Sequence, residues 1–231
     1  MTGTDINKST MNFIPKSKKT IAKYTLLSDN TNLGIYPNFE NAYTKDTNCP
    51  TVNSLKNRFY SVNSPFSLDI KFDKNNYNYK FDTKVHTDNT DMHNLIKRTL
   101  SLDTMKNGVT NLQMLSPYAF VTDDKELEVT ILQPNIINQN VEFATGSLVP
   151  HSWIRTINSA WILTGKEGNV TYSQTKPMFY VLFNKPVDLQ YVEPTEKIFR
   201  YWQHSRDITS YTSNITKHFN YIVNRRPKKL L

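Results

Sequence analysis

Apolar and polar residues alternate strictly along residues 66–72 and again along residues 77–81. Successive side chains of a β-strand point to opposite faces, so each stretch predicts a strand with one buried face. The intervening segment 73–76 is rich in Asp and Asn, which tolerate the backbone of a tight turn. The pattern therefore predicts an antiparallel hairpin.

Similar patterns continue through the second half of the chain. Residues 127–131 and 187–191 alternate, whereas residues 178–183 are apolar on both parities, which predicts a central strand covered on both faces. Pro, Asn and Gly residues separate further short strands, expected at residues 141–144, 153–157, 160–164 and 170–173. We therefore predict a mainly β protein (β-rich α+β). Its body, residues 58–193, is expected to be an antiparallel sandwich or a partly closed barrel.

Helical spacing appears at two places. Apolar residues at positions 92, 95, 96 and 100 predict a helix over residues 91–100. Residues 194–231 are expected to form C-terminal helices and a basic tail. Pro194 can open the first of these helices, and Asp207 can cap a second one whose apolar stripe extends to Val223.

Residues 1–57 are polar and irregular, with prolines at positions 15, 37 and 50. They are expected to form an extended N-terminal arm. Two interpretations remain open: the arm orders only against a neighbouring subunit, or it wraps over its own domain.

The charge balance permits an anionic partner. Lys and Arg number 28 against 20 Asp and Glu in the 231 residues, which gives a formal net charge of +8. Part of this excess lies in a basic tail, formed by Arg225, Arg226, Lys228 and Lys229. The tail can contact a nucleic-acid backbone, or it can be a solvated basic end.

Cys49 is the only cysteine, so no intramolecular disulfide is possible. The first ten residues lack the apolar core of a signal peptide. The longest apolar run, residues 178–183, is far shorter than the roughly 20 residues of a membrane-spanning helix. We therefore expect no signal peptide, no transmembrane segment and no membrane partner.

One set of residues has the character of a metal site. His86, Asp88 and His151 can in principle form the facial triad of an Fe(II)-dependent oxygenase, with loop residues as the alternative interpretation. The sequence contains no phosphate-binding Gly loop, no zinc-type Cys/His spacing and no Gly-x-Ser-x-Gly elbow. The leading expectation is therefore a protein without catalytic residues and without a cofactor.

A second set combines aromatic, imidazole and guanidinium groups within a few residues. His151, Trp153 and Arg155, with Trp161 nearby, can line a ligand pocket or a protein interface. The alternative is that the two tryptophans belong to the core or its rim.

Several stretches resemble uncharacterised proteins of T4-like marine bacteriophages of the cyanophage type, over about half of the chain. The stretches are Cys49-Pro50 and residues 58–66, 116–118, 149–156 and 176–180. The resemblance implies a viral origin and a β-rich fold, and it carries no established activity. The leading hypothesis is a non-catalytic virion or assembly component that contacts other protein subunits in an oligomer. Its expected location is the virion or the host cytoplasm.

Overall fold

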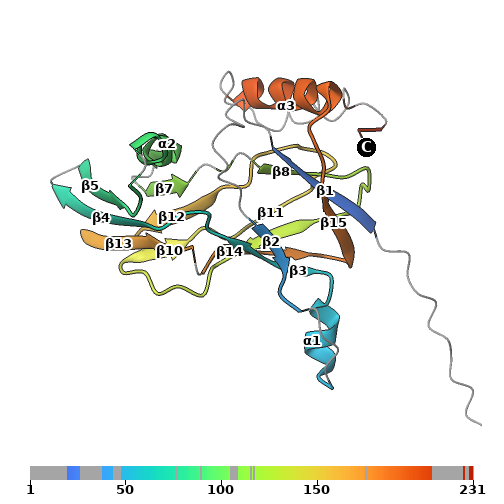
Figure 1. Ribbon diagram of the computed structural model, residues 1–231, viewed down its shortest axis with the longest axis horizontal. Coiled ribbons are helices and arrows are strands. Elements are labelled where there is room, and N and C mark those ends of the chain that lie inside the picture. Colours follow the sequence, from blue (N-terminus) through green and yellow to red (C-terminus); the bar gives the residue numbers. More distant parts are fainter. Residues whose placement is uncertain are drawn as a thin grey trace, which may run out of the picture.

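Fifteen strands and three helices occur in the residues that the structure describes (Figure 1). The computed structural model describes residues 20–26, 38–43, 48–75, 78–88, 90–104, 109–114, 116, 118–174, 176–209, 226 and 229–230. Within the described residues the strands form four sheets. Every pair of neighbouring strands in these sheets is antiparallel except one. The expected β-rich class is confirmed, and none of the four described sheets closes into a barrel.

The largest sheet has five strands and contains the most apolar strand of the sequence at its centre. Its order is β11 (Gly146–Leu148), β9 (Val129–Leu132), β14 (Pro177–Phe183), β3 (Phe59–Asn63) and β2 (Asn38–Asn41). Val181 and Phe183 of β14 are fully buried. The strand is central, as predicted, but Tyr180 and Leu182 are only partly buried, so the expected cover on both faces is incomplete.

The predicted hairpin is also confirmed, although its first strand continues through residues 73–75, which were expected in the turn. It belongs to a three-stranded sheet with the order β13 (Glu167–Tyr172), β4 (Leu68–Asn75) and β5 (Asn78–Val85). The alternating residues Leu68, Ile70 and Phe72 point into the core and are 0%, 0% and 3% exposed. Alternation in the sequence thus becomes one buried and one solvated face of the sheet.

A four-stranded sheet packs beside the hairpin. Its order is β10 (Val141–Phe143), β12 (Ser159–Leu163), β7 (Thr110–Met114) and β6 (Leu100–Thr104). The helix expected at residues 91–100 is α2 (Thr90–Thr99), which buries Ile96.

The strand expected at residues 153–157 does not form. The backbone N–H groups of Ser152 and Trp153 both donate to the carbonyl oxygen of Val149, which makes a tight turn. Beyond this turn only Thr156 forms a bridge, with Ala119. The turn after β11 therefore holds this segment as a loop, despite its apolar residues.

Part of the expected N-terminal arm is built into the sheets. β1 (Thr20–Leu26) is the middle strand of a sheet with β15 (Val187–Tyr191) and β8 (Tyr118–Val121), and β2 pairs with β3. The β1–β15 pair is the one parallel pair. These two segments therefore share sheets with the 58–193 body. α1 (Pro50–Leu55) projects from the side of the molecule opposite α3 (Figure 1).

The C-terminal part contains one described helix, α3 (Glu196–Thr209), just after Pro194. Thr195 caps it, because its hydroxyl accepts a hydrogen bond from the N–H of Ile198 at 3.3 Å. Asp207 lies inside α3, so it does not start a second helix as predicted. Most of the expected second helix, residues 210–225, lies outside the described residues. No helix in the described part of the chain is long and apolar enough to span a bilayer.

Gly168 of β13 packs closely against the side chain of Phe72 and the backbone of Gln139. A Cβ atom at this position would lie 2.5 Å from Cζ of Phe72 and would overlap the carbonyl oxygen of Gln139. The Gly168→Ala variant is expected to lose about 1–3 kcal/mol of unfolding free energy, because Phe72 and a backbone segment must both move. Urea unfolding measures this loss. Gly146→Ala is the matched control, since its Cβ would meet no atom within 4 Å, and equal losses in the two variants would contradict the prediction.

Candidate functional site

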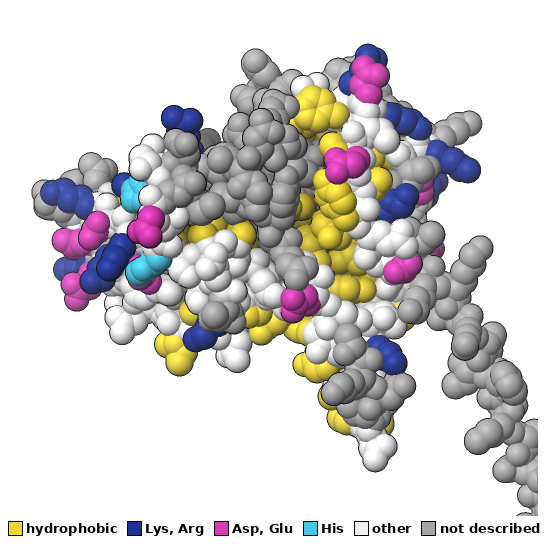
Figure 2. Space-filling model, in the orientation of Figure 1, with side chains coloured by type: hydrophobic (Ala, Val, Ile, Leu, Met, Phe, Trp, Pro, Cys, Tyr) yellow, Lys and Arg dark blue, Asp and Glu magenta, His cyan; other side chains and the backbone are white. Residues whose placement is uncertain are grey.

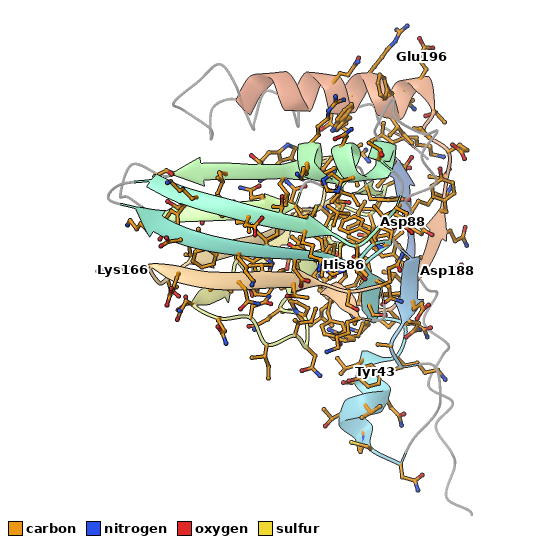
Figure 3. The ribbon with its side chains drawn as sticks, turned by 60° about the vertical axis from the view of Figure 1, so that its left-hand side comes forward. Tyr43, His86, Asp88, Lys166, Asp188 and Glu196 are labelled. Atoms are coloured by element: carbon orange, nitrogen blue, oxygen red, sulfur yellow. The ribbon has the colours of Figure 1, made fainter. Side chains whose placement is uncertain are left out.

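The residues proposed as an iron triad do not come together. His86 and Asp88 lie in the loop after β5 (Figure 3), where His86 Nε2 is 2.6 Å from Asp69 Oδ2. His151 lies near a different set of charges, Asp123 and Arg226 among them. Among the described residues there is no group of three or more His, Cys, Asp and Glu side chains that could hold a metal. The oxygenase hypothesis is therefore not supported, because His86 pairs with Asp69, whereas His151 lies near Asp123 and Arg226.

Asp69 belongs to a polar network on the outer face of β4. Its second oxygen accepts a hydrogen bond from the hydroxyl of Thr171 on β13 at 2.9 Å. The hydrogen bond from His86 is the main reason why the pKa of Asp69 is lowered, with a smaller contribution from Thr171. These contacts tie β13, β4 and the loop after β5 together.

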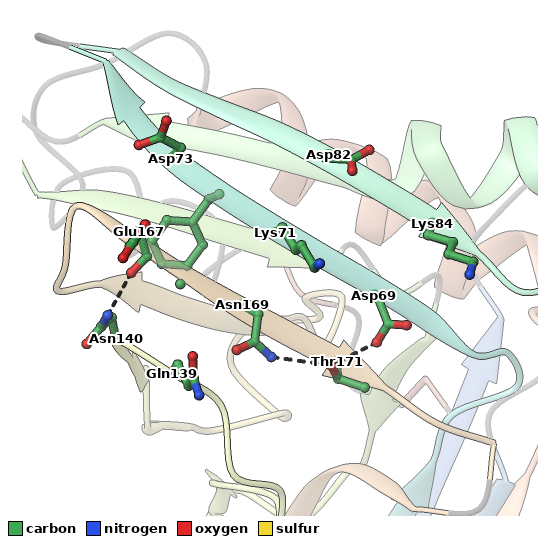
Figure 4. A pocket seen from close by; sticks show the side chains of 12 residues that line it. Asp69, Lys71, Asp73, Asp82, Lys84, Gln139, Asn140, Glu167, Asn169 and Thr171 are labelled. Atoms are coloured by element: carbon green, nitrogen blue, oxygen red, sulfur yellow. Dashed lines mark hydrogen bonds between the residues drawn. The ribbon is translucent and has the colours of Figure 1, made fainter.

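Charges of opposite sign face each other across this outer surface, which we call the polar face (Figure 4). The pairs between β4 and β5 are Asp69 with Lys84, Lys71 with Asp82, and Asp73 with Lys80. Figure 2 shows acidic and basic side chains intermixed at this end of the molecule. Opposite charges that face each other on neighbouring strands stabilise a sheet, and their electrostatic potentials largely cancel. A hollow of about 600 Å³ lies over the polar face, and four carboxylates and two lysines line it. Glu167 of β13 lies opposite Asp73, so the excess charge of the hollow is negative.

Trp161 does not belong to a pocket or interface. It is 1% exposed, and its Nε1–H donates to the hydroxyl of Tyr172 at 3.1 Å. Complete burial raises the pKa of Tyr172 to about 12. Trp161 is therefore a core residue, which corrects the prediction that grouped it with Trp153 and Arg155.

Trp153 and Arg155 do share a site, a groove of about 590 Å³ that we call the β11 groove. Its walls include the whole of β11, residues of β7, β9 and β12, the loop before β12, and the segments just before β9 and β11. The guanidinium of Arg155 lies 5.0 Å from the centre of the Trp153 ring, a cation–π contact. The groove thus combines an aromatic surface, a cation and several amide side chains.

His151 does not line the β11 groove. Burial is the main reason why its pKa is lowered, and the nearby positive charge of Arg226 acts in the same direction. The predicted four-residue site therefore divides into three places: the groove, the core and the surroundings of Arg226.

Arg226 takes part in a contact that the sequence did not reveal, which we call the Asp123 anchor. The Arg226 side chain is 3% exposed and donates to Asp123 Oδ1 at 2.9 Å and to the carbonyl oxygen of Thr122 at 2.7 Å. The N–H of Leu230 donates to the same Asp123 oxygen at 3.0 Å. Leu230 is buried in a small apolar cluster with Ile198 of α3.

The Asp123 anchor changes the interpretation of the basic tail. Arg226 is buried in an ion pair, so it is not available to a nucleic acid as predicted, whereas Lys229 is exposed. Arg225 and Lys228 lie outside the described residues. The physical reason is a long-range ion pair between residues more than one hundred positions apart, which local charge patterns do not reveal.

Asn111 and Glu128 are groove residues that no motif in the sequence indicated. Asn111 is only 6% exposed, although its side chain is polar. Comparison with known proteins gives no further assignment, because the chain matches no family model, no curated protein and no solved structure.

Proposed function

We propose that this chain is a non-catalytic, phage-type protein that works through contacts with other protein subunits, in a virion or in its assembly. The observation that carries the proposal is the stacked pair of Trp153 and Arg155 in the β11 groove. Trp and Arg are among the residues that contribute most to binding energy at protein interfaces, especially in or beside a concave site.

The stretches that resemble phage proteins support the proposal, because they contact one another in the fold. β3, within residues 58–66, pairs with β14, which begins within residues 176–180. Thr156 of residues 149–156 forms a bridge with Ala119, directly after residues 116–118. Apart from Cys49-Pro50, which lies at the start of α1, the similar stretches thus contain segments that meet in the fold, as a shared framework would produce.

The two alternatives have less support. The oxygenase requires a metal centre, and the described residues do not form one around His86 and Asp88. The nucleic-acid hypothesis requires a free basic tail, whereas the Arg226 side chain is buried against Asp123.

A photo-cross-linking residue in the groove tests the proposal. We would replace Thr145, an exposed groove residue, by p-benzoylphenylalanine in the full chain, in the cells or particles in which the chain is made. The expected result is one discrete protein adduct, identified by mass spectrometry. Adding Arg155→Glu is expected to lower the adduct yield several-fold, because charge reversal removes an interface cation.

The matched control places the same cross-linker at Lys166, an exposed position outside the groove. A protein adduct formed at Thr145 and absent at Lys166 supports a specific contact. The same protein adducts at both positions, or no protein adduct at either position, contradict the proposal.

A further inference from the structure

The β11 groove contains a strand edge without a paired strand among the described residues. β11 is the last strand of its sheet, and it pairs only with residues 129–131 of β9. All three of its residues line the groove. A free strand edge presents N–H and C=O groups at a spacing that another extended backbone can match.

A buried acceptor in the same groove lacks a hydrogen-bond partner. The Oδ1 atom of Asn111 is buried and accepts no hydrogen bond, although the residue is only 6% exposed. An unsatisfied buried acceptor lowers the stability of a fold. An unsatisfied group in a native fold needs an explanation, and a donor supplied by a ligand in the groove is one that fits this position.

The groove also contains two charged side chains without an ion-pair partner in the described part of the chain, Arg155 and Glu128. The planar guanidinium of Arg155 can bind a carboxylate through two parallel hydrogen bonds. Its stacking on Trp153 restricts its orientation, which favours such binding.

We infer that the β11 groove binds an extended polypeptide segment of a partner protein as an added strand beside β11. The segment donates a hydrogen bond to Asn111 Oδ1 and places an acidic side chain at Arg155. The groove volume of about 590 Å³ is within the range of ligand sites. A glycan also offers donors to Asn111, but it does not present the regular backbone that the β11 edge matches. This inference rests on the proposed function, since it names the chemistry of the contacting segment.

The probe is a displayed library of random peptides of about ten residues, selected on the full chain. We expect enrichment of peptides that carry Asp or Glu among β-branched residues. Arg155→Glu is expected to weaken their binding about 10-fold or more, and Asn111→Leu about 5- to 10-fold. Every second amide of an added strand faces β11, and the amides between them face away. N-methylation of the first set is therefore expected to abolish binding, and N-methylation of the second set to leave it intact.

Asn111→Leu also separates a binding role from a structural one. Replacing an unsatisfied buried amide by an apolar group of similar size is expected to raise Tm by roughly 2–4 °C, although peptide binding weakens. Asn169→Leu on the polar face is the matched control, and it should leave peptide affinity unchanged.

The inference is overturned if the selection enriches peptides no more strongly on this chain than on the Arg155→Glu chain. It is also overturned if the chain binds a glycan array and binds no peptide. Equal binding of peptides methylated in either register would also overturn it. If cross-linking at Thr145 succeeds while N-methylation and Asn111→Leu have no effect, the proposed protein contact stands and the added strand is wrong. If no protein adduct forms at Thr145, the proposed function itself fails.

Discussion

Replacing Trp161 by alanine is expected to lower the free energy of unfolding by about 3–5 kcal/mol, the usual cost of removing a large aromatic side chain from a core. Trp161 is 1% exposed and contacts Phe143 edge to face, with ring centres 5.1 Å apart. Its Nε1–H also donates to Tyr172, whose hydroxyl is buried beside Ser159. The substitution therefore leaves a cavity and removes one hydrogen-bond donor at the same position.

Urea unfolding, followed by far-ultraviolet circular dichroism, measures the loss. Trp161→Phe is the control that keeps most of the volume and removes the Nε1–H donor, and it should cost about 1–2 kcal/mol, because Tyr172 retains Ser159 as a partner. A loss below about 1 kcal/mol in Trp161→Ala would show that this side chain is not part of the main core.

The strands that the sequence predicts best are those whose burial follows a simple period. From Leu68 to Phe72, β4 buries every second residue, and β14, which pairs with a strand on each edge, buries Phe179, Val181 and Phe183. The local pattern and the tertiary position agree there, so the pattern was sufficient. It failed at residues 153–157, where the turn after Val149 prevents pairing of a segment rich in apolar residues.

Long-range pairing explains the rest of what the sequence did not indicate. β1 pairs in parallel with β15 although more than 160 residues separate them in the sequence. A strand of seven residues carries no local signal that identifies a partner so distant. The expected arm is therefore polar in composition, but two of its segments lie within sheets.

The candidate site was predicted in part, and the reason lies in strand parity. Residues 160–163 are all apolar, so the sequence does not show which side chains face the core. The structure places Ala160 at the β11 groove and Trp161 in the core, on opposite faces of β12. Asn111 is buried on a strand that was not predicted, and a polar residue gives no signal of burial.

Replacing Asp123 by asparagine is expected to lower the free energy of unfolding by about 2–3 kcal/mol. The change keeps the shape of the side chain but removes the charge that neutralises Arg226, which is 3% exposed. This expected loss of unfolding free energy is smaller than the usual cost of breaking a fully buried ion pair, because the Asp123 side chain is 30% exposed. Urea unfolding measures this loss, and Asp82→Asn on the polar face is the control, expected to change stability by less than about 0.5 kcal/mol.

Loss of the Asp123 anchor is also expected to destabilise α3. Leu230 donates its N–H to Asp123 and packs in the same cluster as Ile198 and Tyr201, so releasing it removes apolar cover from the helix. Hydrogen exchange should therefore accelerate in α3 and remain unchanged in β14. The double variant Asp123→Asn with Arg226→Met should recover much of the lost stability, because an apolar side chain does not require a buried counter-charge. If the double variant is no more stable than Asp123→Asn, the ion pair is not what the anchor depends on.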